Sequence, residues 1–237
     1  MMCRLLILQL LAHIVSDFYL QTEESCKDKA NNAFKSKHLY IHASITFVCA
    51  WLFSLNVDYW WAALIIAVLH LIIDGLKSVC KKLKGAFFID QLLHLAVIVA
   101  TVLFYNKLSA VTLPTWLSET KVLLWIVAFV FCLRPANFII KNIFKDAKIS
   151  VPDGGEENSL PNAGRIIGNV ERLLTLIFVM MGQYEAIGFL LAAKSLLRFR
   201  ETDTVKSEYV LVGTLLSFAI AILSGVIVKL IIESNVI

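Results

Sequence analysis

The chain has 237 residues, is 59% hydrophobic and 17% charged, and carries a formal net charge of +4. Its apolar runs are long and continuous, which favours a polytopic α-helical membrane protein over a soluble domain or a membrane barrel. Five scattered cysteines without a C-x-x-C pair argue against a disulfide framework and against a thiolate zinc site. Lysines in the connections account for the net charge, so no nucleic-acid partner is expected.

Apolar segments separated by polar connections predict eight membrane helices. The expected ranges are 2–20, 39–57, 59–77, 87–105, 121–141, 166–182, 185–199 and 209–231. The first is expected to be a retained helix, because it lacks a signal-peptide cleavage site. Glu171 and Arg172 interrupt the sixth and the seventh is short, so a re-entrant hairpin is the alternative for this pair. We expect a four-helix membrane domain at 1–107 and further membrane helices at 108–237, with a cytoplasmic loop at 142–163.

Basic residues follow every second predicted helix. The stretches after the first, third, fifth and seventh helices carry most of them: Lys27, Lys29, Lys35, Lys37, Lys77, Lys81, Lys82, Lys84, Lys141, Lys145, Lys148, Arg198, Arg200 and Lys206. The connections on the opposite side carry few. The positive-inside rule therefore predicts that the basic connections are cytoplasmic and that both termini are external.

Histidine and aspartate recur in pairs that are four residues apart. All five histidines lie in the first 94 residues, and the pairs are His13/Asp17, His38/His42, His70/Asp74 and Asp90/His94. Residues i and i+4 share one face of a helix. Because successive helices run antiparallel, the end of one and the start of the next lie at the same depth. We therefore expect all four pairs to meet near the cytoplasmic membrane surface.

Imidazole and carboxylate ligands together suit a divalent metal, with zinc preferred and iron or manganese as alternatives. Eight ligands exceed the need of one ion, so either two ions share the bundle, or one ion has histidine ligands that the aspartates orient. One aspartate can instead act as general base, and Asp90 and Asp17 are the candidates. The competing interpretation is a buried polar network without metal, although ionisable groups in membrane helices are costly and are functional by default.

Three basic residues of the C-terminal half are weaker candidates. Arg134, Arg165 and Lys194 can bind an anionic phosphate of a substrate only if they converge near the metal. Interhelical ion pairs, and long side chains that reach to the membrane surface, are the competing explanation.

Several segments resemble a known family. The stretches "LLAHIVSDFYLQ", "HASITF", "HLIIDGLK" and "FFIDQLLH" are similar to the bacterial membrane proteins called domain of unknown function 3307. This resemblance implies the bacterial cytoplasmic membrane and supplies no activity. A looser similarity, carried by His70 and Asp74, links the chain to inner-membrane metal-dependent hydrolases with an H-L-L-x-D helix motif.

The leading hypothesis is a membrane-embedded metal-dependent hydrolase that acts on a lipid head group or phosphate at the cytoplasmic membrane surface. A divalent cation transporter or channel is the first alternative, but the outward halves of the first four helices contain almost no acidic residues or histidines. A di-iron enzyme acting on lipid chains is a second, although clustered H-x-x-H-H motifs are absent. A non-enzymatic membrane scaffold is the third.

Overall fold

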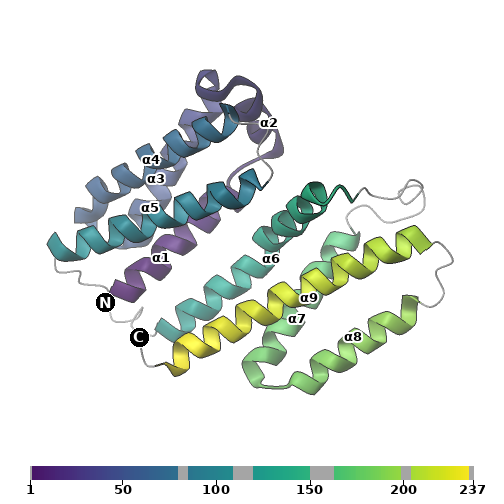
Figure 1. The fold of residues 1–237 in the computed structure, drawn as a ribbon. Coiled ribbons are helices and arrows are strands. Elements are labelled where there is room, and N and C mark those ends of the chain that lie inside the picture. The colour runs from purple at the N-terminus through teal and green to yellow at the C-terminus, as the bar shows by residue number, and fades with distance from the viewer. Residues whose placement is uncertain (1, 80–84, 109–119, 150–162, 199–203, 235–237) are drawn as a thin grey trace. The chain divides into compact units, whose positions relative to one another are not determined.

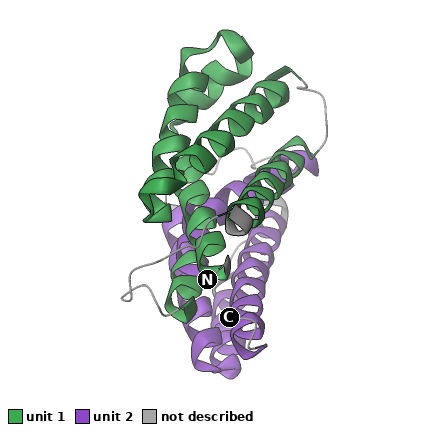
Figure 2. Ribbon diagram, turned by 90° about the vertical axis from the view of Figure 1, so that its left-hand side faces the viewer, with its two compact units in different colours: residues 1–127 green, residues 128–237 purple. Residues whose placement is uncertain are grey.

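The computed structural model describes residues 2–79, 85–108, 120–149, 163–198 and 204–234 (Figure 1). Every regular element in these ranges is a helix, which confirms the all-α prediction. The chain divides into two compact units, residues 1–127 and 128–237, which Figure 2 colours separately.

Unit 1 is a bundle built from α1 (Met2–Ile14), α3 (Lys37–Ser54), α4 (Trp60–Val79) and α5 (Ala86–Leu108). A π-helical turn, η1 (Val15–Tyr19), continues α1, and a 3-10 turn, η3 (Val57–Tyr59), precedes α4.

One half of this bundle is an apolar core. Tyr59 and Tyr105 are fully buried there, with ring centroids 4.8 Å apart, against small residues such as Ala62. The histidines and aspartates occupy the other half of the same four helices.

The connection after the first helix is not the loop that the sequence suggests. Residues 23–32 form α2 (Glu23–Asn32), followed by the short 3-10 turn η2 (Ala33–Lys35). Thr22 and Ser25 form a capping box, in which each side chain accepts a hydrogen bond from the other residue's backbone N–H, both at 3.2 Å. The chain bends by 88° between η1 and α2, so that α2 packs against α3 and α4.

Unit 2 contains the greater part of α6 (Thr120–Asp146) together with α7 (Ala163–Met181), α8 (Tyr184–Arg198) and α9 (Thr204–Glu233). Helix α7 packs closely on α9 because Gly225 has no side chain, and a Cβ there would lie 2.6 Å from Val179 Cγ1. Gly182, at φ +74°, makes the tight turn into α8, a conformation that glycine adopts without strain. Helix α6 runs five residues beyond its expected end at 141, and residues 150–162 of the predicted 142–163 loop lie outside the described ranges.

Four described segments are long and apolar enough to cross a membrane: Val57–Val79, Ala86–Tyr105, Thr120–Asp146 and Ser207–Glu233. A fifth results if the bent pair Cys3–Tyr19 and Glu23–Lys35 is one span. A helix lies in each of the eight predicted ranges, and α2 is additional, but the predicted count of eight membrane-crossing helices is not confirmed. By length and composition the chain is therefore suited to a membrane.

Candidate metal centre

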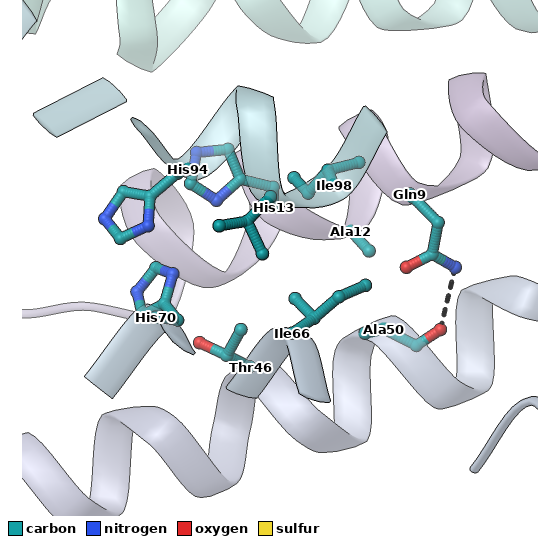
Figure 3. A pocket seen from close by; sticks show the side chains of 10 residues that line it. Gln9, Ala12, His13, Thr46, Ala50, Ile66, His70, His94 and Ile98 are labelled. Carbon is teal, nitrogen blue, oxygen red and sulfur yellow. Dashed lines mark hydrogen bonds between the residues drawn. The ribbon is translucent and has the colours of Figure 1, made fainter. Parts of the chain in front are cut away.

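Seven of the eight predicted ligands come together in unit 1. They lie on η1 and the four bundle helices: His13, Asp17, His42, His70, Asp74, Asp90 and His94. Three groups have potential ligand atoms within 4.8 Å of one another: His13/Asp17/His70, His42/His70/Asp74 and Asp74/Asp90/His94. Figure 3 shows the rings of His13, His70 and His94 gathered beside a small pocket. We call these seven residues the His/Asp cluster.

The centre of the cluster is a triangle of three atoms. His42 Nε2 lies 3.0 Å from His70 Nε2, and Asp17 Oδ1 lies 3.4 Å from each of them. A tetrahedral ion with bonds of about 2.0–2.1 Å holds its ligand atoms roughly 3.3 Å apart. The three edges of the triangle match that spacing, so Asp17, His42 and His70 fit the face of a tetrahedral metal site.

A second set of atoms lies on the α4 and α5 side of the cluster. His94 Nε2 is 3.4 Å from Asp90 Oδ1 and 3.6 Å from Asp74 Oδ1. Within the described part of the chain, His94 Nε2 and Asp90 Oδ1 are buried and make no hydrogen bond. The two atoms face each other as an ion pair without hydrogen-bond geometry, and a buried polar atom that lacks a hydrogen bond costs about 1–3 kcal/mol. A cation between these three residues would satisfy both atoms.

Two lysines that the sequence suggests as topology signals bind the cluster instead. Lys29 Nζ lies 2.5 Å from Asp74 Oδ2, and Lys77 Nζ lies 2.7 Å from Asp90 Oδ2. Lys29 is only 7% exposed, because α2 folds back over α4, whereas the side chain of Lys77 is 38% exposed. The T-x-x-S capping pattern could have predicted α2, but no local signal shows that its lysine returns to Asp74.

Further polar groups orient the cluster. Gln91 Oε1 lies 3.3 Å from His13 Nε2, and Gln91 Nε2 donates to Asp90 Oδ2 at 3.2 Å. Ser16 Oγ donates to Asp17 Oδ1 at 3.1 Å. Asp17 itself lies in the π-helical turn η1, a geometry that recurs at functional sites. Partners of this kind hold metal ligands in position and tune their basicity.

The comparison with protein families covers this whole region. The model of the family described as protein of unknown function (DUF3307) matches residues 5–124. The chain belongs to the DUF3307 family. The matched range contains all seven residues of the His/Asp cluster and confirms the resemblance found in the sequence. No curated protein and no solved structure matches the chain.

The remaining predicted site residues lie elsewhere. His38, the eighth predicted ligand of this DUF3307 protein, is half-buried at the start of α3 and takes part in none of the three groups found among the described residues. In unit 2, Lys194 makes an ion pair with Glu171 at 2.5 Å, and Arg165 lines the same cleft as Lys194. Arg134 is exposed on α6 and does not line that cleft.

The pocket beside the cluster is small. It is lined by Gln9, Thr46 and the three histidines of Figure 3, and its volume is about 10 Å³. That volume is near the minimum for one water molecule. Gln9 Nε2 donates to the Ala50 carbonyl at 2.9 Å and closes the apolar end of the pocket. The pocket can therefore hold a water next to the histidines.

Proposed function

We propose that the DUF3307 half of this chain is a membrane-embedded, metal-dependent hydrolase that acts on a lipid head group or phosphate at the cytoplasmic membrane surface. The triangle of His42 Nε2, His70 Nε2 and Asp17 Oδ1 carries the proposal, because its edges of 3.0–3.4 Å suit one tetrahedral ion. Zinc is the preferred ion for this donor set, and iron or manganese are alternatives.

The positions of the ligand atoms assign different roles to the two predicted catalytic aspartates, Asp17 and Asp90. Asp17 belongs to the triangle, so we assign it to the metal. Asp90 lies outside the triangle, and its carboxylate is held by Lys77 and Gln91. We assign Asp90 as the general base that accepts a proton from the attacking water. A divalent ion at this site supplies Lewis acidity and an activated water.

Lys77 supports a phosphate-bearing substrate. Its side chain is more exposed than any other charged group bonded to the cluster, and its ammonium lies at the edge of the buried carboxylates. A cation in this position attracts an anionic head group toward Asp90. Because the cluster is otherwise buried, substrate entry requires displacement of α2, which Lys29 holds against Asp74.

The membrane arrangement is part of the proposal. Four or five described segments suited to a membrane support a multi-pass protein. We propose that all eight predicted helices cross the bacterial cytoplasmic membrane, with the basic connections inside. In this arrangement both termini are external, and α2 and the His/Asp cluster lie at the cytoplasmic side.

One observation favours a second candidate, a polar network that locks the bundle without metal. Lys29 and Lys77 each neutralise one aspartate, at 2.5 and 2.7 Å, so two of the three buried carboxylates already have a cationic partner. In such a scaffold His42 and His70 simply share one proton between their Nε2 atoms.

Metal analysis of the purified protein separates these two candidates. We expect bound metal in the natural chain and its loss in His70→Ala, with His38→Ala as the matched control because His38 lies outside the cluster. Phosphate release from lipid phosphates and diphosphates should require the same residues and disappear with chelator. Absence of metal above background across several expression conditions would leave the scaffold as the function.

A further inference from the structure

Unit 2 contains a cleft that the proposed hydrolase does not use. Its volume is about 710 Å³, and it lies where α6 ends and where α7 and α9 begin. Among the described residues, five cationic side chains and one carboxylate, that of Glu171, line it; the cationic residues are Lys141, Lys145, Arg165, Arg172 and Lys194. The described lining of the cleft is therefore strongly basic.

Arg172 is the unusual member of this set. It is 2% exposed, and its guanidinium donates to four neutral acceptors: Cys132 O at 2.5 Å, Asn137 Oδ1 at 2.6 Å, Asn169 Oδ1 at 2.7 Å and Ser217 Oγ at 2.8 Å. Among the described residues no carboxylate forms an ion pair with it, because Glu171 binds Lys194 at 2.5 Å. A buried cation is costly unless a countercharge is near. An anion in the cleft would supply that countercharge.

The position of the guanidinium is held before any ligand arrives. The acceptors of its four hydrogen bonds lie on α6, α7 and α9, so the guanidinium cannot move toward solvent without breaking these bonds. Gly168 leaves the necessary room, because a Cβ at that position would lie 3.3 Å from Arg172 Nη1. A rigid, preorganised cation binds an anion at lower entropic cost than a mobile side chain.

The walls of the cleft are apolar. Ile140, Phe144, Ile167, Tyr209 and Val210 contribute to them, and the rings of Phe144 and Tyr209 have centroids 4.9 Å apart. Volumes of 300–1,000 Å³ are usual for small-molecule sites, so the cleft is large enough for a head group and the start of a chain. A small inorganic anion would leave these apolar walls in contact with water.

We propose that the cleft of unit 2 binds an anionic phospholipid. Its phosphate binds the exposed basic rim and compensates the charge of the buried Arg172 beneath it, and its acyl chain follows the apolar walls. The charge complementarity selects an anionic over a zwitterionic head group, and the apolar walls select a lipid over free phosphate. This site is built from unit 2 alone and does not depend on hydrolysis or metal binding by unit 1.

Native mass spectrometry of the full chain in detergent tests the proposal. The probes are phosphatidylglycerol, phosphatidylcholine with the same acyl chains, and inorganic phosphate. We expect retention of phosphatidylglycerol in preference to phosphatidylcholine, and no displacement by millimolar phosphate. The charge variant is Lys145→Gln/Arg165→Gln, and its matched control is Lys27→Gln/Lys121→Gln, which removes two exposed lysines of unit 1. Each basic residue near a membrane surface contributes a factor of about five to anionic-lipid binding, so the charge variant should bind roughly 25-fold more weakly and the control unchanged.

A steric variant tests the cleft without any change of charge. Gly164 lines the cleft, and a Cβ there would meet nothing within 4 Å, so Gly164→Trp adds a bulky side chain at the cleft without a clash at its Cβ. We expect a folded protein that no longer retains phosphatidylglycerol. Equal phosphatidylglycerol binding by the natural chain, the charge variant and Gly164→Trp would overturn the proposal. Displacement of the lipid by free phosphate would overturn it too, because the site would then recognise the anion alone.

Discussion

Replacement of Lys29 by methionine tests how α2 is held against the His/Asp cluster. Lys29 Nζ lies 2.5 Å from Asp74 Oδ2, and only 7% of the residue is exposed. Methionine keeps most of the apolar stem but removes the charge, so Asp74 loses its cationic partner in a buried site. Removing one partner of a buried ion pair costs about 3–5 kcal/mol. We expect that loss in the free energy of unfolding when a chelator is present.

A bound divalent ion should reduce this loss. Asp74 belongs to two of the three potential ligand groups, so with an ion bound its carboxylate keeps a positive neighbour. The difference between the two conditions must reappear, by linkage, as tighter metal binding in Lys29→Met. At room temperature, each difference of about 1.4 kcal/mol corresponds to a tenfold change in the dissociation constant of the metal.

The assay is chemical unfolding in detergent, with and without metal. Lys27→Met is the matched control, because Lys27 is exposed on the same helix and should unfold like the natural chain. Lys77→Met should be intermediate, since an exposed pair contributes about 1 kcal/mol or less and Lys77 is 38% exposed. If Lys29→Met is as stable as Lys27→Met in chelator, the ion pair does not hold α2. If metal leaves the loss unchanged, Asp74 is not near a bound ion.

Three more predictions concern the metal, the packing of unit 2 and the topology. Asp17→Asn should weaken metal binding by at least about 10–100-fold in a metal titration. It is a cleaner test than Asp74→Asn, because Asp17 has no lysine partner among the described ion pairs. Unchanged metal affinity would show that Asp17 is not a ligand. Gly225→Ala should lower the free energy of unfolding by about 1–3 kcal/mol through overpacking, because the new Cβ would lie 2.6 Å from Val179 Cγ1. The control is Gly188→Ala, whose Cβ meets nothing within 4 Å. Equal stability of the two variants would contradict the close packing of α7 on α9. A C-terminal reporter that works only outside the cytoplasm should be active. Activity of a C-terminal reporter that works only in the cytoplasm would contradict the external termini.

The helices and most of the cluster can be predicted from the order of the residues alone. Continuous apolar runs between polar connections specify membrane helices, because a chain in lipid must satisfy its backbone hydrogen bonds internally. The i, i+4 spacing of His70/Asp74 and Asp90/His94 placed each pair on one helix face. Antiparallel chain direction then placed the pairs at one depth, which is why the structure brings them together.

The choice of polar groups at the two sites depends on contacts between residues far apart in the chain. His38 and His42 share their spacing with the other pairs, yet only His42 belongs to the cluster, because His38 lies one turn nearer to the start of α3. The sequence places Lys29 in a predicted loop, whereas the 88° bend before α2 brings it into contact with Asp74. In the sequence, Arg172 interrupts a predicted membrane helix. In the structure its buried guanidinium is held by hydrogen-bond acceptors on three helices. The contacts of Lys29 with Asp74 and of Arg172 with α6 and α9 join residues 35–45 positions apart, and local sequence preference carries no information about such pairs.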